Sequence, residues 1–459
     1  MVRASADAGL TASVRPLICT PRLSTLAALT IVAMCSTTNP AAADDLETCR
    51  KADGQTSVAA CSEAIASGKF QGSELATLYL NRGFIASNLN DLDKAILDYS
   101  ESLKINPEYG LALNNRCSVY IKKAQLDLAI ADCSKAIGLN SNYLNAYINR
   151  ANAYRRKNEN FNAIRDYERA IALDKTSVAA LFGAALSYSA IDDYGNALAN
   201  YNDIIKVDGK NAPAFNNRGL VYLRARDFER AIKDFSAAID LDPKFVFAWN
   251  NRCSAYNSKH EPDNALNDCE RAIELDPKYS NAYTGRGRAY REKGDLDRAI
   301  EDYNLAIKLN PKSSIAFFGR GYAYEKKRDY ARSVGDYSRA SELNPGDPET
   351  WNNLCWSLAV VNQLEKAVSA CDRSLLLRPN DAGTLDSRGF AKLKSRDWDG
   401  AIDDYAAALK IKPDYDSSLY GRGFGKLKIG DSIGGEADIA AAKAINVQVA
   451  EDFKNWGVQ

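Results

Sequence analysis

Residues with reactive side chains are few: the chain of 459 residues holds ten cysteines and one histidine. With His260 alone, neither a Ser-His pair nor a histidine-ligated metal centre can be assembled. No C-x-x-C motif is present, which disfavours zinc. We therefore expect no enzyme activity, no cofactor and no metal site. Six of the cysteines instead form pairs at positions i and i+16, namely Cys117 with Cys133, Cys253 with Cys269, and Cys355 with Cys371.

These pairs occupy two places in a pattern that occurs eleven times, with successive copies 34 residues apart. A period of this length indicates stacked supersecondary units, not a single catalytic domain. Wherever the third residue of the signature is cysteine, the i+16 position from it is cysteine as well, and elsewhere that second place holds tyrosine, phenylalanine or isoleucine. The third residues are Gly83, Cys117, Ala151, Ala185, Gly219, Cys253, Gly287, Gly321, Cys355, Gly389 and Gly423.

Within each period the residue pattern predicts two antiparallel helices. In residues 282–290 the packing residues recur at intervals of three and four, which is helical spacing. Gly294 and Asp295 end this segment, residues 296–307 predict a second helix, and Pro311 follows the end of that helix.

In the same repeat, the order aromatic, small, tyrosine, alanine, aromatic, alanine, proline is held by Tyr283, Gly287, Tyr290, Ala299, Tyr303, Ala306 and Pro311. This order resembles the tetratricopeptide repeat, here of an exported bacterial type, and the match covers residues 76–449. The resemblance implies an all-α fold, a right-handed superhelical solenoid of antiparallel helix pairs whose first helices line a concave groove. Residues 44–75 would form a degenerate N-terminal capping repeat and residues 450–459 a C-terminal tail.

Residues 1–43 stand outside the repeat and have the features of a secretory signal. Three arginines precede or flank the apolar run 23–33, and an A-x-A cleavage site ends at Ala43. We expect an exported chain, periplasmic or secreted, whose mature form does not span the membrane, because no later segment approaches the roughly 18 apolar residues of a membrane span. A lipid anchor at Cys35 is the alternative. Basic and acidic residues number 59 each, so the composition does not indicate a nucleic-acid partner.

The spacing of the paired cysteines suits disulfide bonds between the two helices of a repeat. Packed helices have axes roughly 8–10 Å apart, so facing backbones approach the Cα separation of about 4.4–6.8 Å that a disulfide needs. Reduced cysteines, buried as small hydrophobic residues, are the alternative. The predicted bonds are Cys117–Cys133, Cys253–Cys269, Cys355–Cys371 and, in the degenerate repeat, Cys49–Cys61.

An arginine precedes the third signature residue in nine repeats, and the i+16 position from that arginine is an aspartate. The two repeats without the arginine, at Ala184 and Leu354, also lack the aspartate, at Asn200 and Ala370. Loss of one partner alone would leave a partly buried charge unpaired, which is strongly destabilising. The pattern predicts an ion pair within each repeat, and a row of arginines that binds a polyanion is the alternative.

Two sets of first-helix residues remain as candidates for contact with a partner. One is the asparagine before the arginine position, whose amide can both donate to and accept from a peptide main chain. Its alternative is the ordinary use of asparagine in repeats that bind nothing through it. This set comprises Asn81, Asn115, Asn149, Asn217, Asn251 and Asn353.

The other set consists of aromatic residues in the late repeats, which together would form an apolar patch large enough to suggest a partner site. Packing of these rings against the neighbouring repeat is the alternative. The set comprises Phe318, Tyr322, Trp356, Phe390, Tyr420 and Phe424. Together the two sets favour a scaffold that binds extended segments of a protein or peptide partner in the groove. A structural or assembly role in the cell envelope is the second hypothesis.

Overall fold

A computed structural model describes residue 49 and residues 55–458 of the chain. The predicted signal at 1–43, including Cys35, lies outside the described residues. The chain divides between Asp242 and Pro243 into two compact units. Throughout the described part, all regular secondary structure is α-helical.

The first unit contains α2 to α12. They are α2 (Gln55–Ala66), α3 (Gly72–Asn88), α4 (Leu92–Ile105), α5 (Gly110–Lys122), α6 (Leu126–Leu139), α7 (Leu144–Arg156), α8 (Asn160–Leu173), α9 (Val178–Ala190), α10 (Tyr194–Val207), α11 (Ala212–Arg224) and α12 (Phe228–Leu241).

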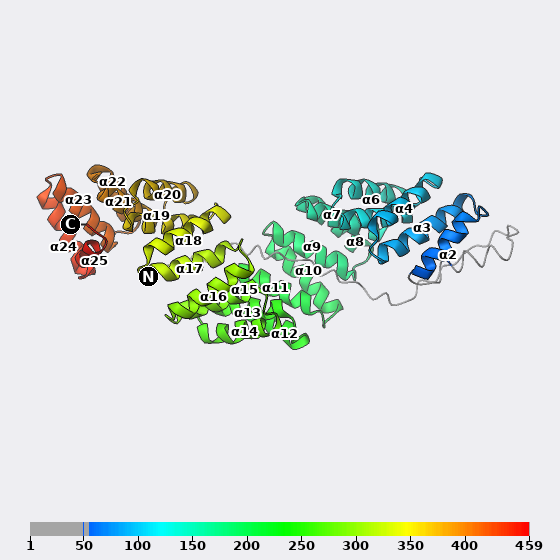
Figure 1. Cartoon of the computed structure of the whole chain (residues 1–459), viewed down its shortest axis with the longest axis horizontal. Coiled ribbons are helices and arrows are strands. Elements are labelled where there is room, and N and C mark those ends of the chain that lie inside the picture. Colours follow the sequence, from blue (N-terminus) through cyan, green and yellow to red (C-terminus); the bar gives the residue numbers. More distant parts are fainter. Residues whose placement is uncertain (1–48, 50–54, 459) are drawn as a thin grey trace. The chain divides into compact units, whose positions relative to one another are not determined.

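The second unit contains α13 to α25, and in both units consecutive helices run antiparallel in pairs (Figure 1). They are α13 (Val246–Ser258), α14 (Pro262–Leu275), α15 (Ser280–Glu292), α16 (Leu296–Leu309), α17 (Ser314–Lys326), α18 (Tyr330–Leu343), α19 (Pro348–Val360), α20 (Leu364–Leu377), α21 (Ala382–Lys394), α22 (Trp398–Ile411), α23 (Asp416–Lys428), α24 (Ser432–Ile445) and α25 (Val449–Asn455).

The turn between the two helices of a pair is built alike along the chain. One residue takes a left-handed backbone conformation, as at Asn158 with φ 61° or Gly294 with φ 81°. The next residue caps the second helix, and the Asp295 carboxylate accepts a hydrogen bond from the backbone N–H of Arg298. The lone histidine, His260, occupies the left-handed position with φ 60°, so its place in the fold is that of a turn residue.

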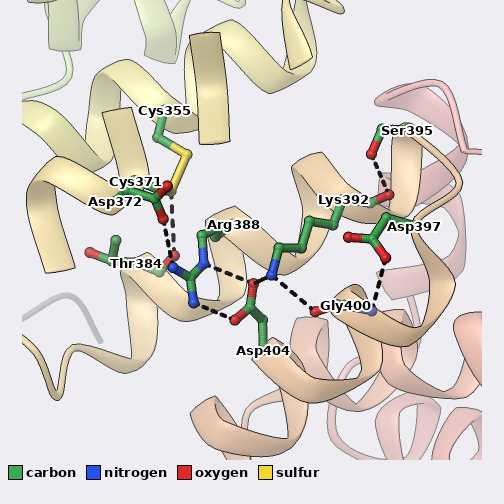
Figure 2. A network of polar contacts seen from close by, with 10 residues as sticks. All are labelled: Cys355, Cys371, Asp372, Thr384, Arg388, Lys392, Ser395, Asp397, Gly400 and Asp404. Atoms are coloured by element: carbon green, nitrogen blue, oxygen red, sulfur yellow. Dashed lines mark hydrogen bonds and ion pairs between the residues drawn. A yellow bond between two sulfur atoms is a disulfide. The ribbon is translucent and has the colours of Figure 1, made fainter. Parts of the chain in front are cut away.

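Size complementarity between the two helices explains why the two cysteine positions change together. A Cβ atom at Gly83 would lie 2.9 Å from the Tyr99 ring, so even alanine at that place would displace the aromatic side chain of the second helix. Where both places hold cysteine, the two small side chains fill the same space. The sulfur atoms of Cys117 and Cys133 lie 2.12 Å apart. The other pairs at 2.01–2.08 Å are Cys49–Cys61, Cys253–Cys269 and Cys355–Cys371, the last drawn in Figure 2.

The predicted ion pair is confirmed in all nine repeats that carry the arginine and the aspartate. In Figure 2, Arg388 donates from Nε and Nη2 to the two carboxylate oxygens of Asp404, at 2.9 and 2.6 Å. Its Nη1 atom also donates to Asp372, at 2.6 Å, in the second helix of the preceding repeat. Arg116 reaches the hydroxyl of Ser100 in the same way, at 2.9 Å. The arginine therefore joins three helices and two repeats.

The ion pair leads to a double-mutant prediction. Arg286→Leu leaves the carboxylate of Asp302, which is 3% exposed, without its bidentate donor, and we expect the free energy of unfolding to fall by about 2 kcal/mol. Arg286→Leu combined with Asp302→Ala should lose at least about 1 kcal/mol less than the sum of the single losses. Chemical denaturation measures all three. Arg298→Leu, at an exposed pair with Asp295, is the control and should change little. Additive losses would contradict a coupled pair.

The cysteine positions lead to a second prediction. Digestion of the mature chain without reduction should release peptides joined as the four pairs described. Each of the three pairs within a complete repeat closes a loop of about 15 residues, worth about 3 kcal/mol in the chain-entropy model, and repeats feel such terms locally. Reductant should therefore increase hydrogen exchange in the cysteine-containing repeats earlier than in the repeat formed by α9 and α10, which holds no cysteine. Free thiols, or bonds between different repeats, would refute the pairing.

Candidate functional site

The asparagine row lies where consecutive repeats meet, and most of its amides have partners inside the chain. Asn149 donates to the side-chain oxygen of Asn114, at 2.9 Å, and Asn217 donates to the Pro213 carbonyl of its own helix, at 2.8 Å. Asn115 accepts from the side chain of Asn114, at 3.4 Å. An amide that already bonds within the chain must give up that bond before it can hold a peptide.

The remaining asparagines point to the same conclusion with one exception. Asn353 donates to the Tyr337 hydroxyl of the preceding repeat, at 3.5 Å, and Asn251 is 9% exposed. Asn81 differs, because its buried amide nitrogen has no hydrogen-bond partner. In four other repeats this place is glycine, and at Gly319 a Cβ would overlap the preceding tyrosine ring. The row thus contributes first to packing between repeats, and a ladder of free amides is a weaker hypothesis than its spacing suggests.

The first two residues of the aromatic set lie on α17 and are partly exposed. The Phe318 ring packs against the ring of Tyr337, with centroids 5.6 Å apart. Tyr322 lies under the guanidinium of Arg291, at 4.6 Å, and near the ammonium of Lys326, at 5.0 Å from the ring centroid. The Tyr322 ring therefore lies beside two positive charges.

The structure corrects the expectation that Phe390 is an exposed anchor. Phe390 is 1% exposed, because Trp356 packs on it at 4.9 Å and Phe453 at 5.7 Å between ring centroids. Trp356, Phe390 and Tyr420, on the first helices α19, α21 and α23, form what we call the aromatic surface. Phe424, also on α23, is partly exposed beside Lys428, whose ammonium lies 4.8 Å from its ring centroid.

The C-terminal tail covers this aromatic surface. Residues predicted as a tail form α25, and Phe453 of that helix lies 4.7 Å from Tyr420 between ring centroids. Trp456 follows α25 and lies 4.8 Å from Trp356 in an edge-on arrangement. The sequence interpretation missed both residues, although Phe453 is at the i+34 position from Leu419 and so continues the repeat register.

Lys394 connects α19, α21 and the tail. Its ammonium donates to the Ala359 carbonyl at 2.9 Å and to the Val360 carbonyl at 3.2 Å, where α19 ends. A cation at this end of a helix is favoured by the helix dipole. The same ammonium donates to the Trp456 carbonyl at 2.9 Å. Burial lowers the pKa of Lys394, and its three carbonyl partners satisfy the ammonium donors.

Asp386 is a buried acid beside the aromatic surface that the sequence interpretation also missed. It lies on α21, is 6% exposed, and accepts hydrogen bonds from the hydroxyls of Ser417 at 2.9 Å and Ser418 at 2.6 Å. Burial raises its pKa from 3.8 to about 6, and the serine donors oppose that shift only in part. The corresponding residue in the preceding repeat is Asn352, an uncharged amide of similar shape.

This raised pKa predicts the pH dependence of Asp386→Asn. The folded chain holds the Asp386 proton more tightly than the unfolded chain, so its stabilising effect is present below about pH 4 and is lost as the pH rises through about 6. Asparagine does not ionise, so at pH 7.5 the variant should be more stable by roughly 2 kcal/mol, and the gain should shrink towards pH 4. Urea unfolding at several pH values measures it. Asp403→Asn, at an exposed position of α22, is the control. A gain that does not vary with pH would disprove the assignment.

The described residues contain no group of three or more histidine, cysteine, aspartate or glutamate side chains able to hold a metal ion. Over the same part of the chain, every helix is too short or too polar to cross a membrane. What the first helices offer is aromatic and cationic side chains suited to contact with a polypeptide.

Comparison with known families identifies the repeat. Models of the tetratricopeptide repeat match residues 76–109, 144–177, 212–245, 246–279 and 269–301, and a further model described as TPR repeat matches residues 287–327. A comparison with curated protein sequences finds no match.

Among solved structures, a tetratricopeptide repeat protein from Parabacteroides merdae is 20% identical, with a TM-score of 0.48, over 54% of this chain and 97% of its own. A chain of the APC/C hetero-tetramer Cut9-Hcn1 is 18% identical, with a TM-score of 0.49, over 81% and 80%. Yeast Tom70 is 16% identical, with a TM-score of 0.39, over 84% and 96%. With its eleven-fold signature, its helix pairs and the family models that match them, this chain belongs to the tetratricopeptide repeat proteins.

Proposed function

We propose that this protein is an exported scaffold that binds segments of partner proteins on the first helices of its late repeats. The observation that carries the proposal is the set of partly exposed aromatic residues on α17, α19 and α23, namely Phe318, Tyr322, Trp356, Tyr420 and Phe424. Aromatic side chains provide large contact areas at protein interfaces. Exposed apolar residues also occur on the second helices, as at Phe161 of α8 and at the adjacent Leu376 and Leu377 of α20.

Two observations support export. The residues before position 44 have the order of a secretory signal, with basic residues, an apolar run and a cleavage site. The eight cysteines that follow form four pairs at bonding distance, a use of cysteine typical of oxidising compartments. An exported scaffold of this kind would recruit its partners outside the cytoplasm.

Site-specific photo-crosslinking tests the surface. A photoreactive residue in place of Tyr322 or Phe424, in cells that make the full chain, should capture partner proteins in the compartment where the mature chain resides. The same residue in place of Phe161, which is 77% exposed on the second helix α8, is the control and should capture few. Mass spectrometry of the products identifies the partners and shows whether they are envelope components. Capture at Phe161 without capture at Tyr322 or Phe424 would move the binding surface away from the first helices.

A further inference from the structure

The C-terminal helix α25 lies in the place of the first helix of a further repeat, since Phe453 is at the i+34 position from Leu419. It spans Val449–Asn455, seven residues, whereas α23 of the preceding repeat has 13. Val449 and Phe453 are both 2% exposed and point one apolar face of the helix into the unit. A seven-residue helix is not stable by itself in water, so its order depends on what it packs against.

The contacts of this segment reach further than those of a terminal cap. In a repeat array each repeat contacts its immediate neighbours, so a cap on the last repeat needs only α23 and α24. Trp456 instead packs on Trp356 of α19, two repeats before the repeat of α23 and α24, and its carbonyl accepts a hydrogen bond from Lys394 of α21. One residue thus contacts the first helices of two earlier repeats, α19 and α21.

The attachment of the segment is mostly aromatic and is confined to one end of the chain. Phe453 packs on Phe390 and Tyr420, and Trp456 on Trp356 and Phe390, all with ring centroids 4.7–5.9 Å apart. The short link 446–448 connects α24 to α25. The surface beneath this segment is formed by complete repeats. Another segment with the same aromatic side chains can therefore take its place.

From these contacts we infer that residues 449–458 are an internal ligand of the aromatic surface. The partner segment that replaces them is a short helix with one aromatic residue in its last turn and a second aromatic residue three positions later, as in Phe453 and Trp456. It carries acidic residues as well, because Lys326 and Lys428 lie beside Tyr322 and Phe424, two partly exposed rings that pack against the same core as this surface. The tail itself has Glu451 and Asp452 in its first turn. This inference rests on the proposed scaffold function and names the chemistry of its partner.

A peptide competition experiment on the full mature chain tests the inference. The probe is a fluorescein-labelled peptide of residues 446–459, and its binding is followed by anisotropy. The variant Phe453→Ala with Trp456→Ala should bind the peptide, whereas the unaltered chain should bind it at least about ten-fold more weakly, because its own tail competes at an effective concentration of about millimolar. Ile433→Ala, at a residue of α24 that is 88% exposed, should behave as the unaltered chain does. A peptide with both aromatic residues replaced by alanine should bind neither.

Lys394→Met provides a second variant that keeps both tail aromatics. It removes the donor to the Trp456 carbonyl of the tail, so the α25 amides should exchange hydrogen faster than in the unaltered chain. The peptide loses the same donor, so its binding should stay below that of the double variant. A natively folded double variant that binds no peptide, or an unaltered chain that binds it equally well, would overturn the inference. A dimer formed through the tail would also overturn it, since the occupant would then be a second copy. Crosslinking at Tyr322 does not depend on the tail, so failure here leaves the scaffold proposal standing.

Discussion

One arginine in the first helix holds three helices together in most of the repeats. Its two carboxylate contacts close the pair within the repeat, as from Arg388 to Asp404, and its third contact reaches the second helix of the repeat before, as from Arg388 to Asp372. Because the guanidinium is planar and always charged, it can make all three contacts at once. The carboxylate is buried with it, so neither partner can be lost alone.

Packing between the helices depends on a second constraint, which is the volume available between the first and second helix. A ring on the second helix requires a glycine or alanine opposite, as at Gly219 beneath Phe235, where an added Cβ would lie 2.7 Å from the ring. Two cysteines are the other way to fill that space, and they bring a covalent bond in a compartment that permits it. Repeats of both kinds occur in the same array.

With the interior occupied by these contacts, the residues free to vary are those of the first-helix surface. In repeats near the C-terminus they are aromatic, and the chain ends by laying its own Phe453 and Trp456 on them. Trp356 and Phe390 are therefore covered in this state, while Tyr322 and Phe424 remain accessible beside lysines. This surface suits a helix that carries aromatic side chains, and the tail is one such segment.

The sequence by itself determined the helix pairs, the register and the arginine-aspartate pairing. Eleven copies in one chain act as their own comparison, and residues that change together, such as Leu354 with Ala370, reveal contact within a repeat. Only the tertiary structure decided the contacts between repeats. These depend on how helices far apart in sequence come to lie beside one another, which the repeat period does not encode. For that reason the burial of Phe390, the internal bonds of the asparagine row, the raised pKa of Asp386 and the reach of Trp456 to Trp356 could not be predicted from the pattern.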